Sequence, residues 1–176
     1  MVQKLLLAFV VATATLAVAA VAWSQITSLF GNKQSVPEIT VQDLRQLQLN
    51  QIDAENKAVS SGKAKPTAEY VVVDVRAESE TEVSVIPDGI TVSQYEANSE
   101  KYKGRTVICY CTVGYRSEIY ARKLIAKGVS TKNFKGSILV WCEAKFPLET
   151  LDRQPTNHVH TYNSSYRVPA DYVAVW

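Results

Sequence analysis

The chain has 176 residues, of which 47% are apolar and 20% are charged. This is the composition of an ordinary single globular domain, and it excludes a chain that is disordered throughout. The 19 lysines and arginines nearly balance the 17 aspartates and glutamates, which leaves a net charge of +2. Strong non-specific nucleic-acid binding needs a more basic surface, so we expect no nucleic-acid partner. The three cysteines are an odd number, so at least one thiol is free.

The first predicted element is apolar. Leu5–Trp23 contains 19 residues without a charge, and as a helix it would be about 28 Å long, close to the thickness of a bilayer core. Lys4 precedes it and Lys33 is the next cation, so the positive-inside bias predicts a single-pass membrane anchor with the domain on the non-cytoplasmic side. Ala17–Ala19 and Ala20–Ala22 fit a signal-peptide cleavage pattern, so an exported soluble protein is the alternative.

Composition divides the chain into four parts. Residues 1–24 form the membrane anchor or signal peptide, 25–35 a polar tether, 36–150 the domain and 151–176 an irregular C-terminal extension. Tyrosines and valines of the extension are set among Asn, Ser and Pro without a clear period. This pattern indicates a tail laid along the domain surface, not a second domain.

The first half of the domain predicts one helix and two strands. Val41–Leu49 has apolar residues at helical spacing, with Thr40 as the N-cap, and the polar segment Asn50–Thr67 is predicted to be a surface loop. Tyr70–Val73 and Thr106–Cys111 are apolar runs rich in β-branched residues, which is typical of strands buried on both faces.

The second half predicts two more helices. One is Ser117–Lys127, which ends at Gly128, and the other is Ser137–Lys145, which ends before Pro147. Strands that alternate with helices predict an α/β domain built around a parallel sheet.

The most informative segment joins the second strand to the next helix. Cys111 lies at the end of the strand, and Gly114 occupies the centre of a short turn because glycine adopts a positive φ freely. Backbone N–H groups of such a turn and the helix N-terminus form an anion cradle, and Arg116 adds a cation. A thiol at its base is held partly as thiolate. We expect Cys111 to attack an electrophilic sulfur or phosphorus centre.

The number of residues between the cysteine and the arginine separates two kinds of enzyme. Protein tyrosine phosphatases have five, whereas Cys111 and Arg116 are separated by four, so the loop Cys111–Ser117 resembles the Cys-x-x-Gly-x-Arg-Ser loop of the single-domain rhodanese family. Other segments resemble elements of the same family in the family's order: Val71–Glu78, Ile86–Ile90, Lys135–Ile138 with Trp141, and Pro147–Leu148. The resemblance covers about 36–148.

The resemblance implies a rhodanese-like fold, in which a parallel β-sheet is flanked by helices, and a sulfurtransferase activity. Cys111 would carry sulfane sulfur as a persulfide from a small donor to a thiophilic acceptor such as cyanide or a thiol. No metal or organic cofactor is implied. The active-site loop that binds the anion would consist of Thr112, Val113, Gly114, Tyr115 and Arg116, with Asp74 and Arg76 in support.

Several alternatives stay open at this point. A rhodanese-like binding or sensing module with little turnover is the second functional hypothesis, and a phosphatase or arsenate reductase is disfavoured by the loop length. Arg116 either holds the loop or binds the anion directly. Cys109 and Cys142 are expected in the core, with a resolving thiol as the alternative for Cys109. Uncharged side chains at 112, 113 and 115 favour a donor other than thiosulfate.

Overall fold

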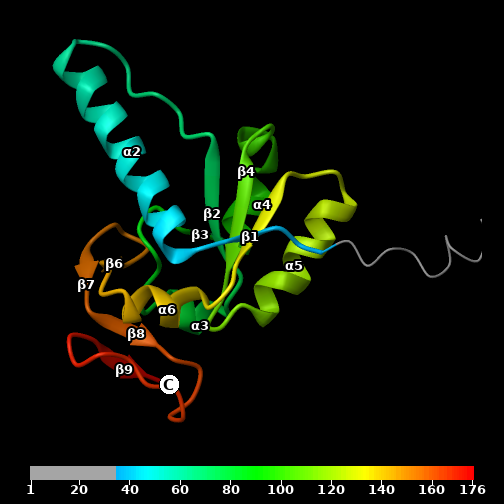
Figure 1. Ribbon diagram of the computed structural model, residues 1–176, viewed down its shortest axis with the longest axis vertical. Helices are drawn as coiled ribbons and strands as arrows, with labels where there is room; N and C mark the ends of the chain where they lie inside the picture. Colours follow the sequence, from blue (N-terminus) through cyan, green and yellow to red (C-terminus); the bar gives the residue numbers. More distant parts are fainter. Residues whose placement is uncertain (1–34) are drawn as a thin grey trace, which may run out of the picture. The chain divides into compact units, whose positions relative to one another are not determined.

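The computed structural model describes residues 35–176 (Figure 1). The predicted anchor or signal peptide and the tether up to residue 34 lie outside this part of the chain. Within the described residues, no helix is long and apolar enough to cross a membrane. Membrane anchoring therefore stays a prediction from the sequence.

A five-stranded sheet forms the centre of the domain. Its strands are β1 (Glu38–Ile39), β2 (Tyr70–Asp74), β3 (Ile90–Thr91), β4 (Thr106–Tyr110) and β5 (Thr131–Phe134). Their spatial order is β1-β5-β4-β2-β3, and every neighbouring pair is parallel. The two predicted strands are thus neighbours near the middle of the sheet, where burial on both faces accounts for their apolar sequences.

Helices cover both faces of the sheet. They are α2 (Val41–Ser60), α3 (Glu78–Thr81), α4 (Val92–Ala97), α5 (Tyr115–Ala126) and α6 (Ser137–Glu143), with a 3₁₀ helix η1 over Ser99–Tyr102. Residues of α2 and α6 share one apolar core with alternate residues of the strands, and residues of α4 and α5 share a second core. Figure 1 shows α2 and α6 on one side of the sheet and α5 on the other. The predicted α/β fold is confirmed.

The first helix is longer than predicted. Thr40 caps it as expected, since its hydroxyl accepts a hydrogen bond from the Asp43 N–H at 3.1 Å. However, the predicted loop Asn50–Thr67 is wrong over its first part, because α2 continues to Ser60. This part is largely exposed and therefore has no apolar period, but it is rich in good helix formers. A hydrogen bond between the Gln51 and Glu55 side chains, one turn apart, supports it.

The ends of the other predicted elements shift by a few residues. Strand β4 ends at Tyr110, so Cys111 is the first residue of the loop. Helix α5 begins at Tyr115, two residues earlier than predicted, and Gly128 follows it with a φ of 80°. Helix α6 ends at Glu143.

The C-terminal extension contains short strands. The antiparallel pair β6 (Leu148–Glu149) and β7 (Pro155–Thr156) leads to the parallel pair β8 (His158–His160) and β9 (Val173–Val175). Strands of two or three residues are too short to display a period in the sequence. The extension also packs on the domain, because Val159 is fully buried in the same core as Trp141.

Candidate active site

The topology brings two distant segments of the sequence to one edge of the sheet. Asp74, the last residue of β2, is in register with Tyr110, the last residue of β4. The backbone N–H of Val75 continues the ladder by donating to the Tyr110 carbonyl at 2.9 Å. The segment after β2 and the cysteine loop after β4 therefore lie side by side at the carboxyl ends of the strands, where sites form in parallel α/β sheets.

Gly114 is required at its position by conformation and by space. It has a φ of 105° and is the residue from which α5 starts. A side-chain Cβ at this position would lie 3.1 Å from the Gly136 nitrogen and 3.2 Å from the Lys135 Cα. Because both neighbours are backbone atoms, a larger residue would push the loop away from the start of α6.

The start of α6 orients the peptides of the loop. The N–H groups of Gly136, Ile138 and Leu139 donate to the carbonyls of residues 113, 111 and 112, at 3.2, 3.1 and 3.3 Å. In a trans peptide the N–H points opposite to the C=O. The N–H groups of residues 112 to 114 are therefore turned away from α6 and toward the centre of the loop.

Ser137 combines a backbone conformation typical of glycine with a side chain that bonds to the loop. Its φ is 54°, in the left-handed region that glycine adopts at no cost. The serine hydroxyl accepts a hydrogen bond from the Cys111 N–H at 3.0 Å and donates one to the Phe134 carbonyl at 2.8 Å. These two bonds attach the base of the loop to the chain just before α6.

The sulfur of Cys111 is surrounded by hydrogen-bond donors. The Gly114 N–H donates to Sγ at 3.1 Å, and the Ser117 hydroxyl lies 3.6 Å away. Burial raises the pKa of the Cys111 thiol, but hydrogen bonds from Ser117, Gly114 and Val113 outweigh burial and bring the pKa below its usual value. The site therefore favours the thiolate, which is the nucleophilic form.

The other two cysteines have the opposite environment. Cys109 and Cys142 are fully buried in the two apolar cores, and burial raises the pKa of each thiol to about 12. Both pack in the core as predicted. Among the three thiols, Cys111 alone has a lowered pKa.

Arg116 is held by an acidic residue that we did not single out from the sequence. Its guanidinium makes two hydrogen bonds to the Glu80 carboxylate, at 2.6 and 2.9 Å, and one to the Thr112 hydroxyl at 2.8 Å. Burial raises the pKa of Glu80, but the bonds from Arg116 and the Ala77 N–H lower it to about 2. Arg116 thus holds the loop through a carboxylate and a hydroxyl.

Glu80 is positioned by the short helix α3. The segment Val71–Glu78, which resembles the family, ends at an acidic residue that is exposed, whereas Glu80 is buried. Glu80 is the third residue of α3, and its carboxylate accepts the Ala77 N–H at the start of that helix at 2.9 Å. This is the glutamate position of a capping box, but Ala77 at the N-cap has no side-chain acceptor, so the Ser/Thr-x-x-Glu signature is absent from the sequence.

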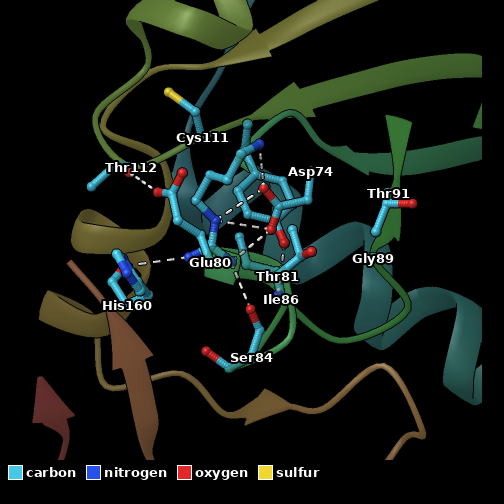
Figure 2. A network of polar contacts seen from close by, with 12 residues as sticks. Asp74, Glu80, Thr81, Ser84, Ile86, Gly89, Thr91, Cys111, Thr112 and His160 are labelled. Atoms are coloured by element: carbon cyan, nitrogen blue, oxygen red, sulfur yellow. Dashed lines mark hydrogen bonds and ion pairs between the residues drawn. The ribbon is translucent and has the colours of Figure 1, made fainter. Parts of the chain in front are cut away.

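Asp74 and Arg76 form a fully buried ion pair with an N–O distance of 2.7 Å. Arg76 also donates to the carbonyls of Ser84, at 2.6 Å, and His160, at 3.4 Å. Figure 2 shows this network beside Glu80 and Thr112, with the sulfur of Cys111 directed away from it. The pair therefore joins the end of β2 to the following loop and to the C-terminal extension.

The remaining predicted loop residues differ in exposure. Thr112 is buried, whereas Val113 and Tyr115 are exposed, Tyr115 to 71%. A separate hollow of about 720 Å³, lined by Tyr95, Tyr102 and Tyr120, contains no residue of the loop. The hydrogen-bond donors to the Cys111 sulfur come from the loop and the first turn of α5, away from this hollow.

Comparison with known proteins gives the family. A model of the rhodanese-like domain matches residues 56–144, about half of the chain, and the chain belongs to this family. A "Sulfurtransferase" of Allochromatium vinosum is 29% identical over 104 residues, which cover 57% of this chain and 94% of that protein. A "tRNA sulfurtransferase" of Thermoplasma acidophilum is 26% identical over 121 residues, 60% of this chain and 25% of that protein. The chain thus spans only a quarter of the Thermoplasma protein.

A solved structure of similar fold is the thiosulfate sulfurtransferase from Pseudomonas aeruginosa, with 20% identity and a TM-score of 0.49. The match covers 68% of this chain and 21% of that one.

Proposed function

We propose that this protein is a sulfurtransferase that moves sulfane sulfur through a persulfide on Cys111. The observation that carries the proposal is the convergence of the Gly114 N–H and the Ser117 hydroxyl on a thiol whose pKa is lowered. The names of the relatives support the same reaction class. A persulfide is an anion, and the inward N–H groups of the loop suit it.

The reaction has two steps. In the first, the Cys111 thiolate attacks the sulfane sulfur of the donor; a new S–S bond forms, and the donor remnant leaves with the electron pair of the bond that breaks. In the second, the acceptor, a thiolate or cyanide, attacks the outer sulfur of the persulfide. The bond between the two sulfurs breaks, and the Cys111 thiolate is restored.

The charges of the site favour a donor other than thiosulfate. Arg116 is the single charged side chain in the loop 111–117, and its charge is balanced by Glu80 at 2.6 Å. A dianion such as thiosulfate gains little from a cation that is already paired. We therefore propose a donor of lower charge.

A rhodanese-like binding module is the second candidate function. The observation in its favour is apolar exposure beside the nucleophile, at Val113 and Tyr115 of the loop and at Ile119 one turn further along α5. Exposed apolar clusters of this kind occur at protein interfaces. In this case the domain would bind a partner protein and turnover would be incidental.

Mass spectrometry separates the two candidates. The protein is treated with thiosulfate, inorganic polysulfide or an organic trisulfide and then digested and mapped. We expect the peptide that contains Cys111 to gain the mass of one sulfur atom, and cyanide to remove it. The Cys111→Ser variant is the control. No sulfur on Cys111 with any of the donors would contradict the proposed transfer and favour the binding module.

A further inference from the structure

The C-terminal extension reaches the active-site loop through one aromatic side chain. Tyr162 follows β8, and the centre of its ring lies 5.4 Å from the Arg116 guanidinium carbon. Arg116 belongs to the same loop as Cys111, and its guanidinium donates a hydrogen bond at 2.8 Å to the hydroxyl of Thr112, the residue that follows Cys111. Tyr162 thus contacts a side chain of the active-site loop directly. It also lies beyond residues 56–144, the part that matches the family.

Hydrogen bonds hold the backbone before and at Tyr162 in place. Thr161 is fully buried, and its N–H donates to the Val175 carbonyl of β9 at 2.8 Å. The His160 carbonyl accepts from the buried Arg76 guanidinium, and the Nδ1 of the His160 ring accepts the Tyr162 N–H at 3.1 Å. Tyr162 itself has a φ of 73°, which is uncommon for a residue other than glycine. These contacts fix the direction in which the tyrosine ring leaves the chain.

The position of the ring limits what Arg116 offers to a substrate. The donors of the guanidinium are directed at Glu80 and Thr112, and Tyr162 interacts with it as a cation–π partner. The Arg116 side chain is 34% exposed, but the Tyr162 ring, which is 60% exposed, stands between part of it and solvent. An anion that approaches from this side meets an aromatic ring before it meets the cation.

We propose that Tyr162 is a specificity-determining residue of the Cys111 site. It screens Arg116 from small dianions. Its ring also provides an aromatic contact surface for an organic sulfur compound that carries an apolar or aromatic group. Val113 and Tyr115 add further exposed apolar surface on the loop itself. The substrate class that we infer, organic thiols and persulfides, rests on the proposed sulfur transfer.

The first test measures how Tyr162 filters reagents that approach Cys111, and it requires no turnover. Three alkylating reagents of different character are compared: iodoacetate, which is an anion, iodoacetamide, which is neutral, and N-benzyl iodoacetamide, which is aromatic. In each case the thiolate displaces iodide and forms a C–S bond. The rate of modification is followed by mapping the Cys111 peptide, which separates the modification of Cys111 from that of Cys109 and Cys142.

Tyr162→Ala should change the rates of the charged and the aromatic reagent in opposite directions. Iodoacetate should react faster and N-benzyl iodoacetamide more slowly, each by roughly two- to fivefold, the range of an exposed aromatic contact. Iodoacetamide should be little affected. Tyr162→Phe keeps the ring and should behave like the parent. Trp176→Ala removes another exposed aromatic residue of the extension and is the matched control.

The second test repeats the comparison with sulfur donors. Tyr162→Ala should raise kcat/KM for thiosulfate and lower it for dibenzyl trisulfide. Equal changes for both classes of reagent, or none, would overturn the role of Tyr162. If the parent protein transfers no sulfur while the alkylation rates change as expected, the proposed function fails and the screening role of Tyr162 stands. Thermal unfolding of each variant identifies any loss of folding, and Tyr162→Leu then provides a second variant without the aromatic ring.

Discussion

At the scale of single residues, Cys111 differs from the other cysteines because hydrogen-bond donors surround its sulfur. The donors to its sulfur come from the turn that follows it and from the first turn of α5. Cys109 lies two residues earlier, within β4, but its surroundings are apolar and raise the pKa of the thiol. Two residues of chain therefore separate a reactive environment from an inert one.

Replacement of these two cysteines should separate activity from stability. Cys111→Ser should abolish sulfur transfer, because a serine hydroxyl is not ionised near neutral pH, and should leave the unfolding temperature nearly unchanged. Cys109→Ser should keep the reaction but lose about 1–3 kcal/mol of unfolding free energy, because it buries a hydroxyl among apolar groups. Sulfur-transfer rates and thermal unfolding measure the two effects. Full activity in Cys111→Ser would contradict the mechanism.

The pH dependence of alkylation reports the ionisation of Cys111 directly. Since the thiolate is the reactive form, the rate with iodoacetamide rises with pH through the thiol pKa and then levels off. The lowered pKa predicts a plateau at a lower pH than for a small free thiol. Ser117→Ala removes one donor to the sulfur and should move the profile to higher pH. The exposed Ser164→Ala is the control, and a profile that is unchanged in Ser117→Ala would argue against the role of the hydroxyl.

Glu80 connects the active-site loop to acid stability. The pKa of its carboxylate is about 2 in the folded protein, below the value of about 4.3 for an unperturbed glutamate. The ionised carboxylate therefore stabilises the fold above pH 4, and this contribution is lost as the pH falls from about 4 toward 2. Glu80→Gln should be less stable than the parent at pH 7, and the difference should shrink in acid. Urea unfolding at several pH values measures this, and a difference independent of pH would contradict it.

At the scale of secondary-structure elements, α6 and the loop form one unit. The loop carbonyls bind the N-terminus of α6 through residues 136, 138 and 139, while its N–H groups face the sulfur. The size of the anion cradle is therefore set by the number of residues between Cys111 and Gly114 and by the hydrogen bonds that hold the loop carbonyls on the start of α6.

Inserting one alanine between Val113 and Gly114 should break this match. The loop would gain one peptide and reach the length found in tyrosine phosphatases, but its carbonyls would no longer align with the donors of α6. We expect sulfur transfer to fall at least tenfold and the alkylation profile of Cys111 to move to higher pH. An alanine inserted after Gly62, in an exposed turn, is the control. An active-site insertion that transfers sulfur as fast as the parent would mean that loop length does not set specificity.

The elements that could be predicted from the sequence are those in which buried residues recur periodically or form a continuous apolar run. Strands β2 and β4 are apolar because both of their faces are covered. Helix α5 mixes apolar and polar residues because only one of its faces is covered. The exposed second part of α2 and the short strands of the extension lack such a pattern. The predicted nucleophile and its loop are contiguous in the sequence, whereas Glu80 and Tyr162 reach the loop through long-range contacts that spacing alone does not encode.

At the scale of the whole molecule, the extension and the domain form one folded unit, 36–176. The buried Arg76 is bonded to the end of β2, to Ser84 and to His160 of β8, so it connects these three segments. Its ion pair with Asp74 stabilises this arrangement only while both partners are present, because a single buried charge is costly. The extension is therefore bonded directly to the buried ion pair of the rhodanese-like core.

The location of the protein is a further prediction for the whole chain. Leu5–Trp23 has no charge and is followed by no cluster of basic residues, which predicts a membrane anchor with the domain on the non-cytoplasmic side. The full-length protein should sediment with membranes after a carbonate wash and be released by detergent. Protease added from the non-cytoplasmic side should digest the domain. A chain that begins at Gln25 should be soluble and keep the alkylation profile of Cys111, because the contacts to the sulfur come from residues after 110. A mature N-terminus near Ala20 or Trp23 would identify a cleaved signal peptide instead, and protection from outside protease would reverse the predicted orientation.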